Sequence, residues 1–240
     1  MKMMKRLLTS LMVALMTFGA MAQDDNTIKF LGIPVDGTKI EMEQRLRTEK
    51  GFYYENSFYR EGGILSGNFN GHRVKVSVSD YNGKVKRVAI FFPDASESQV
   101  KIQYNNLFNQ LRNNEKYLYN PIDSSGELSE EEDISYEMSI HNKQYQNVFI
   151  YPPYGTMNGF NKKIAEAENP EDVLNDEELM AFANATFKDG KADEAAIILW
   201  IIEHSEGHVW YTIGEGNDYG TYRIVMFYDN IKNTPNGEDL

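Results

Sequence analysis

The clearest pattern in the chain is an alternation of apolar and polar residues, best seen where Val74, Val76 and Val78 are separated by polar side chains. Such alternation is typical of a strand with one buried and one solvated face. Asn-Gly pairs at 70–71 and 82–83 suit the positive φ angles of tight hairpin turns. The pattern therefore predicts a three-stranded meander with strands at 64–69, 72–81 and 84–92.

Two helices are predicted to flank the meander. In 36–52, Thr38 and Glu41 have the spacing of a capping box, and Gly51 is a helix stop. In 93–114, Ser96 and Gln99 form a second capping box. The second helix carries a single apolar stripe that suits packing against the meander, namely Val100, Tyr104, Leu107, Phe108 and Leu111.

The rest of the chain is assigned from turn residues and shorter apolar runs. The predicted elements are a strand at 28–35, two short strands within 134–153 that turn near 141–143, a loop at 155–163, a helix at 170–187 that Asn169 caps, and a hairpin at 208–229 that turns at 217–220.

The segment 191–207 fits two structures. Its run of isoleucines suits a strand. Its Asp-Glu-Ala-Ala beginning and the stop at Gly207 suit a helix. We predict a helix, because the stretch between Gly190 and Gly207 is long for a strand.

Hairpins dominate this order of elements, and the strand–helix–strand alternation of a parallel sheet is missing. We therefore predict an α+β fold, a largely antiparallel sheet built from hairpins and a three-stranded meander, with amphipathic helices packed on one face. Residues 120–133 are polar and acidic and predict a loop or linker. Residues 23–240 are predicted to be a single domain. Two similar halves divided near 120–133 are the alternative, although no sequence repeat is evident.

Residues 1–22 have the layout of a secretory signal peptide. The basic stretch "MKMMKR" precedes an apolar run, and "AMA", which ends at Ala22, makes a small-x-small cleavage site. We predict cleavage between Ala22 and Gln23 and a periplasmic or secreted protein. The apolar run is short for a membrane anchor and no later run is long enough to span a bilayer, so no membrane insertion is expected after cleavage.

The chain is acidic, with a formal net charge of −12, and it contains no cysteine. An acidic surface repels nucleic acid, so no nucleic-acid partner is expected. Without cysteine there are no disulfides, no thiol nucleophiles and no Cys-based zinc or iron–sulfur sites. Stability must therefore come from packing.

Candidate chemistry is sparse. Among the four histidines, His204 and His208 have a helical metal-binding spacing, but Gly207 lies between them and ends the predicted helix. Acidic runs such as "EEED" fall in loops or at helix starts, where carboxylates are solvated. The tail "DNIKNTPNGEDL" lacks the register of a calcium loop and predicts a strand end and a turn. We assign no catalytic, cofactor-binding or metal-binding residue and expect no cofactor.

Aromatic side chains gather in "GFYYENSFYR", outside any clear periodic element. Exposed tyrosines combine a large contact area with a polar tip, which suits the binding of proteins or sugars. Ordinary core and hairpin packing is the other interpretation. The candidate binding surface consists of Tyr53, Tyr54, Phe58 and Tyr59.

Three stretches carry a family resemblance: "FLGIPVDGTK", "DISYEMSIHNKQY", and "YRIVMFYDN" with "NGEDL". The chain resembles small exported proteins of Gram-negative gut bacteria of the Bacteroides type, a family of unknown function. The resemblance implies export and a compact α+β fold, and it supplies no catalytic residue. At the level of fold alone, the predicted architecture resembles beta-lactamase-inhibitor-like and PepSY-like periplasmic domains, which does not establish a role.

We expect a non-enzymatic binding or interaction module with an unknown protein or glycan partner. The alternative is a hydrolase of envelope or dietary glycans that works through acidic residues not identifiable from sequence. A structural component of the cell envelope is a third reading.

Overall fold

A computed structural model describes residues 27–55, 63–167, 173, 175–188 and 191–235. The chain forms two compact units. We call the described residues of 27–151 and 206–235 the sheet unit, and those of 152–205 the helical unit. Within the described residues, no helix combines the length and the apolar character needed to cross a bilayer.

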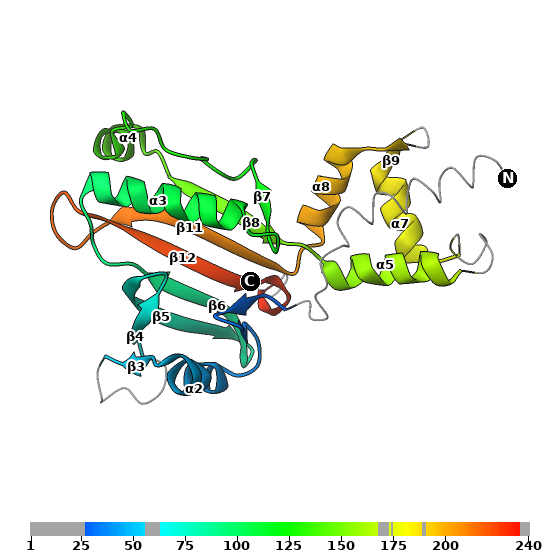
Figure 1. The fold of residues 1–240 in the computed structure, drawn as a ribbon, viewed down its shortest axis with the longest axis horizontal. Coiled ribbons are helices and arrows are strands. Elements are labelled where there is room, and N and C mark those ends of the chain that lie inside the picture. The colour runs from blue at the N-terminus through cyan, green and yellow to red at the C-terminus, as the bar shows by residue number, and fades with distance from the viewer. Residues whose placement is uncertain (1–26, 56–62, 168–172, 174, 189–190, 236–240) are drawn as a thin grey trace. The chain divides into compact units, whose positions relative to one another are not determined.

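The sheet unit is built on one eight-stranded antiparallel sheet with the strand order β3-β4-β5-β6-β12-β11-β8-β7 (Figure 1). The predicted α+β class and the largely antiparallel sheet with helices on one face are confirmed. The strands are β3 (Tyr53–Tyr54), β4 (Leu65–Phe69), β5 (His72–Tyr81), β6 (Lys84–Phe91), β7 (Leu118–Asn120), β8 (Gln146–Tyr151), β11 (Gly207–Glu215) and β12 (Tyr222–Asn230).

The predicted meander is formed by β4, β5 and β6. Its first turn places Asn70 and Gly71 at φ angles of 49° and 78°, and its second places Asn82 and Gly83 at 48° and 77°. Both central residues of each turn thus have the positive φ that the Asn-Gly pairs predicted. The valines of β5 are buried on one face of the sheet, as their alternation with polar residues indicated.

Both predicted capping boxes are present. Thr38 precedes α2 (Lys39–Lys50), and its backbone N–H donates to Glu41 Oε2 at 3.0 Å. Ser96 precedes α3 (Glu97–Arg112), and its backbone N–H donates to Gln99 Oε1 at 3.2 Å. The five apolar residues predicted to form one stripe on α3 are all buried, and α3 lies across β12, β8 and β7 (Figure 1).

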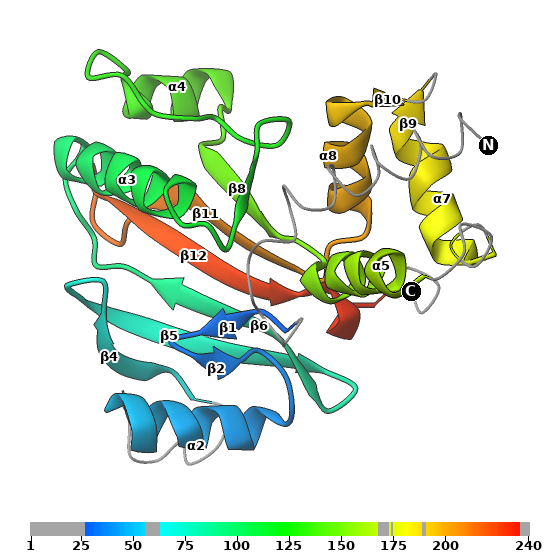
Figure 2. The same ribbon diagram turned by 45° about the vertical axis from the view of Figure 1, so that its right-hand side comes forward.

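A small hairpin covers the same side of the sheet (Figure 2). The strand predicted at 28–35 is instead β1 (Lys29–Phe30) and β2 (Ile33–Pro34), because Leu31 and Gly32 adopt positive φ angles and reverse the chain. The Phe30 ring packs against Phe69 and Tyr228, with ring centroids 5.4 and 5.2 Å apart. The hairpin therefore adds apolar area to the core beneath it.

The order of elements in the sheet unit runs twice. A helix, α2, is followed by the four strands β3 to β6. A second helix, α3, is followed by β7, β8, β11 and β12, with the short helix α4 (Ile134–His141) inserted between β7 and β8. The two series meet where β6 pairs with β12, so the sheet order of the second series mirrors that of the first. The chain passes from one series to the other at 92–96, and residues 120–133 lie inside the second series.

One prediction for 134–153 is wrong. The first of the two predicted strands is the helix α4 (Ile134–His141). Asp133 caps its start by accepting from the Tyr136 N–H at 2.8 Å, and Asn142 ends it with a positive φ of 52°. Local capping therefore outweighs the alternating pattern of Ile134, Tyr136 and Met138, whereas the second predicted strand is present as β8.

The prediction of a loop at 155–163 is also wrong, because these residues belong to the helix α5 (Tyr154–Glu166). Two glycines obscured a helical stripe whose members are all buried, namely Tyr154, Met157, Phe160 and Ile164.

The helical unit consists of α5, α7 (Glu177–Thr186) and α8 (Glu194–Glu203), with a small hairpin of β9 (Phe187–Lys188) and β10 (Lys191–Ala192). The helix predicted for the ambiguous segment 191–207 is present as α8. The start predicted for the third helix at Asn169 lies outside the described residues, and α7 is capped by Asp176. The rings of Phe160, Phe182 and Trp200 form the centre of this unit, with centroids 4.8 to 6.2 Å apart.

The last predicted hairpin is present as β11 and β12, and its strand end behaves as expected. Asn230 Oδ1 accepts from the Lys232 N–H at 3.1 Å and begins the short 3-10 helix η1 (Ile231–Asn233). Its Nδ2 donates to the Val35 carbonyl at 2.8 Å, and Asn233 Nδ2 donates to the Val85 carbonyl at 2.8 Å. Asn230 and Asn233, two of the oxygen-rich residues of the tail, therefore stabilise the fold through these hydrogen bonds. Residues 236–240 lie outside the described part of the chain.

Replacing Gly67 by alanine should destabilise the sheet unit. A β-carbon at Gly67 would overlap the ring of Phe52, which is buried, and such overpacking costs about 1–3 kcal/mol. We expect a lower midpoint in urea denaturation followed by tryptophan fluorescence. The control is Gly214→Ala on β11, whose β-carbon would have no neighbour within 4 Å. An equal loss of stability in both variants would contradict the role assigned to Phe52.

Candidate binding surface

The face of the sheet opposite α2 and α3 carries large side chains that the described helices of the sheet unit do not cover. We call it the open face. The strand register places on it the residues that alternate with the buried core, because successive side chains of a strand point to opposite faces. Its centre consists of Phe91, Val148, Trp210, Thr212, Val225 and Phe227, all half-buried.

An aromatic pair forms the middle of the open face. Trp210 and Phe227 are register partners on β11 and β12, and their rings stack with centroids 4.1 Å apart and planes 23° from parallel. Aromatic cross-strand pairs stabilise a sheet. Large rings left half-buried on a sheet face are also the residue types that protein interfaces favour.

Asp229 fixes the groups around this aromatic pair. Arg87 Nε donates to Asp229 Oδ1 at 2.6 Å, Arg87 Nη2 donates to Oδ2 at 2.8 Å, and Trp210 Nε1 donates to Oδ2 at 2.8 Å. The Asp229 side chain is 8% exposed and that of Arg87 is 39% exposed. The bond to Asp229 raises the pKa of Arg87 above its ordinary value, and the guanidinium is a permanent cation on this face.

The Arg87 guanidinium also lies against both rings. Its central carbon is 4.8 Å from the Phe227 centroid and 5.5 Å from the Trp210 centroid. A planar guanidinium held by a bidentate carboxylate and placed near aromatic rings has little freedom left. The cluster therefore presents a charged group in one defined orientation.

A hollow of about 340 Å³ extends the open face toward the β4–β5 side. Three cations line it. Lys75 pairs with Glu55 at 3.0 Å and Arg223 pairs with Asp94 at 2.8 Å. The hydroxyl of Tyr53 accepts from Arg73. Arg223 Nε is buried without a hydrogen-bond partner among the described residues, so the hollow keeps an unused donor.

The structure separates the aromatic residues predicted as a binding surface. Tyr53 is 45% exposed, and its register partner Ser66 places it at the edge of the open face. Tyr54 points toward α2, where its hydroxyl donates to Glu43 Oε2 at 2.7 Å. Tyr53 therefore fits the predicted surface and Tyr54 has a packing role. Phe58 and Tyr59 lie outside the described residues, as do the cleavage-site residues Ala22 and Gln23.

The structure places His204 and His208 in different elements, as the predicted helix end at Gly207 implied. His204 ends α8 in the helical unit, and its ring stacks on Trp200 with centroids 4.1 Å apart. His208 belongs to β11 in the sheet unit. In the described part of the chain, no group of three or more His, Asp or Glu side chains is placed to hold a metal ion.

The acidic run within 120–133 has structural roles where it is bonded. Glu132 Oε1 accepts from the Tyr145 hydroxyl at 2.6 Å and pairs with Lys143 at 2.5 Å, and the bond from Lys143 is the main cause that lowers the pKa of Glu132. Asp133 caps α4. A glycosidase acid needs a raised pKa, so Glu132 is unsuited to that role.

Sequence reasoning missed the centre of the open face. The runs "HVWYTIGEG" and "YRIVMFYD" were predicted as strands, but the face to which each aromatic residue points depends on register and on where the helices pack. A usable signal was present, because β12 carries apolar residues at consecutive positions from Ile224 to Tyr228. A strand covered on one side only should alternate, so such a run indicates apolar residues on the second face.

Comparison of the chain with protein-family models, with curated proteins and with solved structures gives no significant match.

Lowering the pH should destabilise the sheet unit through His208. Burial lowers the pKa of His208 from its ordinary value of 6.5, while the nearby carboxylates of Asp229 and Asp123 act in the opposite direction. The unfolded chain therefore gains a proton before the folded chain does as the pH falls through 6.5. The free energy of unfolding should decrease between pH 7.5 and pH 5.5.

His208→Gln should flatten this dependence, since it removes the titrating ring. The matched control is Thr212→Gln on the same strand, which should keep the wild-type slope. Chemical denaturation at a series of pH values measures both. The carboxylates with lowered pKa values, such as Glu132, titrate below about 4.5 and stay out of this range. A wild-type slope in His208→Gln would assign the effect to another group.

Proposed function

We propose that the protein is an exported, non-enzymatic binding module that holds a protein partner on its open face. The observation that carries the proposal is the cluster of Trp210, Phe227 and Arg87, half-exposed and fixed by Asp229. Tryptophan and arginine are the residues that most often dominate binding energy at protein interfaces. A cluster already held in position loses little freedom when a partner binds, which favours affinity.

The charge on the open face suggests the chemistry of the partner. The whole chain has a formal net charge of −12, yet this face gathers Arg73, Lys75, Arg87 and Arg223. Its carboxylates, Asp229, Asp94 and Glu55, are each paired with one of these cations. The best match is a protein surface with apolar side chains flanked by Asp or Glu, because complementary charge favours association and orientation.

A protein partner fits better than a sugar. Trp210 and Phe227 each cover one face of the other's ring, and Arg87 lies near both, which reduces the free ring face on which a sugar could stack. Among the described residues no observation supports the hydrolase alternative, since Asp229, Asp94 and Glu55 on the open face are engaged in ion pairs.

Export is testable at the predicted cleavage site. A full-length chain expressed in a Gram-negative host should reach the periplasm or the medium with Gln23 as its first residue, as read by intact-mass measurement. Ala22→Arg should leave the leader attached, because the cleavage site requires small residues. Met21→Leu changes the unconstrained position between the two alanines and should be processed normally. A full-length chain that stays in the cytoplasm would contradict export.

Site-specific photo-crosslinking tests the open face. A benzoylphenylalanine at position 225 lies at its centre, and one at position 140 replaces a residue of α4 that is 59% exposed. In cells of the source organism, the first position should give a discrete adduct with one protein and the second should not. The adduct should weaken severalfold in Arg73→Glu/Lys75→Glu, as expected if these cations attract an acidic partner.

Lys162→Glu is a single charge-reversal control in the helical unit, because its side chain is 73% exposed on α5. It should leave the adduct unchanged. Identical adducts from positions 225 and 140, or an adduct insensitive to the double charge reversal, would count against the open face as the binding surface.

A further inference from the structure

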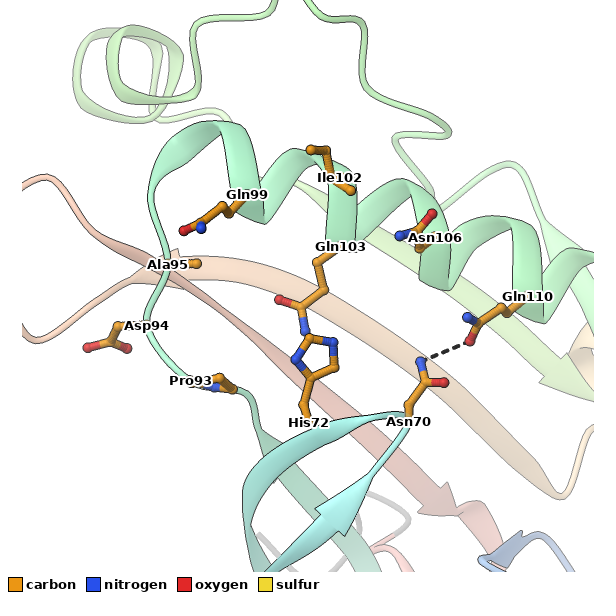
Figure 3. A pocket seen from close by; sticks show the side chains of 10 residues that line it. All are labelled: Asn70, His72, Pro93, Asp94, Ala95, Gln99, Ile102, Gln103, Asn106 and Gln110. Carbon is orange, nitrogen blue, oxygen red and sulfur yellow. Dashed lines mark hydrogen bonds between the residues drawn. The ribbon is translucent and has the colours of Figure 1, made fainter.

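A second concave site lies on the other side of the sheet, between α3 and the β4–β5 turn (Figure 3). Its volume is about 480 Å³. Half of its lining consists of carboxamide side chains, so we call it the carboxamide pocket. These side chains are Asn70, Gln99, Gln103, Asn106 and Gln110.

The carboxamides at the two ends of the pocket are engaged. Asn70 Nδ2 donates to Gln110 Oε1 at 2.9 Å, as the dashed line in Figure 3 marks. Gln99 Oε1 accepts from the Ser96 backbone as part of the capping box of α3. These bonds leave the middle of the pocket to Gln103 and Asn106, which lie almost one turn apart on α3.

Gln103 is the unusual member. Figure 3 shows its side chain extending from α3 toward His72. Its Nε2 is buried and has no hydrogen-bond partner among the described residues. A buried donor without a partner destabilises the folded state, and native structures retain few of them. An unused donor inside a concave site is therefore an observation that points to a ligand.

On the opposite flank of α3, a carboxamide side chain binds the main chain of another segment of the protein. Asn105 Nδ2 donates to the Leu128 carbonyl at 2.8 Å, and the Leu128 N–H donates back to Asn105 Oδ1 at 2.9 Å. This paired contact holds an irregular chain segment by its main chain. Lys101 adds bonds to the carbonyls of Glu130 and Glu132, at 2.9 and 2.7 Å.

The same contact occurs a second time. Asn147 on β8 accepts from the Gly126 N–H at 2.9 Å and donates to the Gly126 carbonyl at 3.1 Å. A carboxamide offers one acceptor and two donors, which matches the acceptor and donor of a peptide unit. The protein thus already binds its own chain through two carboxamide–main-chain pairs, and one of them comes from α3.

We propose that the carboxamide pocket binds an extended polypeptide segment of another protein, with Gln103 and Asn106 pairing with its main chain. Ile102 borders the site and is 63% exposed, so it offers contact to an apolar side chain. Asp94 is already bonded to Arg223 and to the Asn217 N–H, which leaves the pocket close to neutral. An uncharged segment therefore fits best, and this site shares only Pro93 and Asp94 with the hollow of the open face.

Panning the mature protein against a phage-displayed library of random dodecapeptides provides the probe. The selected peptides should be uncharged and carry an apolar residue. Gln103→Met and Asn106→Ala should each weaken a synthetic selected peptide by about tenfold in fluorescence polarisation, the loss expected for one or two hydrogen bonds. Asn109→Ala removes a carboxamide from the opposite flank of α3 and should leave the affinity unchanged.

A second measurement separates binding from folding. Gln103→Met removes the unpartnered donor while nearly keeping the volume, so its melting temperature should equal or exceed that of the wild type. A lower melting temperature would mean that the amide has a structural role, and the proposal would fail.

The chemistry of the peptide gives a third readout. N-methylation of one backbone amide of the selected peptide should abolish binding, whereas alanine replacement of the same residue should have a smaller effect. The absence of any peptide that distinguishes wild type from Gln103→Met would overturn the proposal. A glycan-array signal lost in Gln103→Met would overturn it too, since it would assign the pocket to a saccharide.

Discussion

The pairing of β6 with β12 is the contact on which the sheet unit depends. It joins two series of a helix and four strands, and its partners are far apart in sequence, as the separation of 142 residues between Arg87 and Asp229 illustrates. Bringing such distant segments together carries an entropic cost, and the pairing must be specified by register. Val88 opposite Tyr228 and Ile90 opposite Met226 set that register on the buried face, while Arg87 opposite Asp229 sets it on the open face.

The same junction explains why the open face has a defined chemistry. Asp229 lies at the point where β6, β12 and β11 are adjacent, and it bonds Arg87 from one neighbour and Trp210 from the other. A shift of one residue in this register would send these side chains to the helix-covered side. Because Arg87 is partly exposed, the ion pair adds little to the stability of the fold. Its main effect is to select one strand register and one arrangement of these side chains.

Much of the fold could be predicted from signals between neighbouring residues, whereas the features that depend on residues far apart in the sequence could not. Asn-Gly pairs and capping boxes act within four residues, so the meander, α2 and α3 could be read from sequence. The helix α4 was missed because its alternating apolar residues do not reflect burial: Tyr136 is 50% exposed and Ile140 59%. The consecutive apolar residues of β12 indicate a second apolar face, but no spacing in the sequence encodes which distant strand or turn lies beside a residue of the open face or of the carboxamide pocket.

The strand register shows that the helical unit is inserted between two strands that pair with each other. Tyr151 at the end of β8 is the register partner of Gly207 at the start of β11. The chain therefore leaves the sheet and returns to it at adjacent points, as tolerated domain insertions do. The corresponding strands of the first series, β4 and β5, are joined by the two-residue Asn70–Gly71 turn alone. The β8–β11 pairing therefore does not require a long connection, and the residues that form the two candidate surfaces all lie outside 152–205.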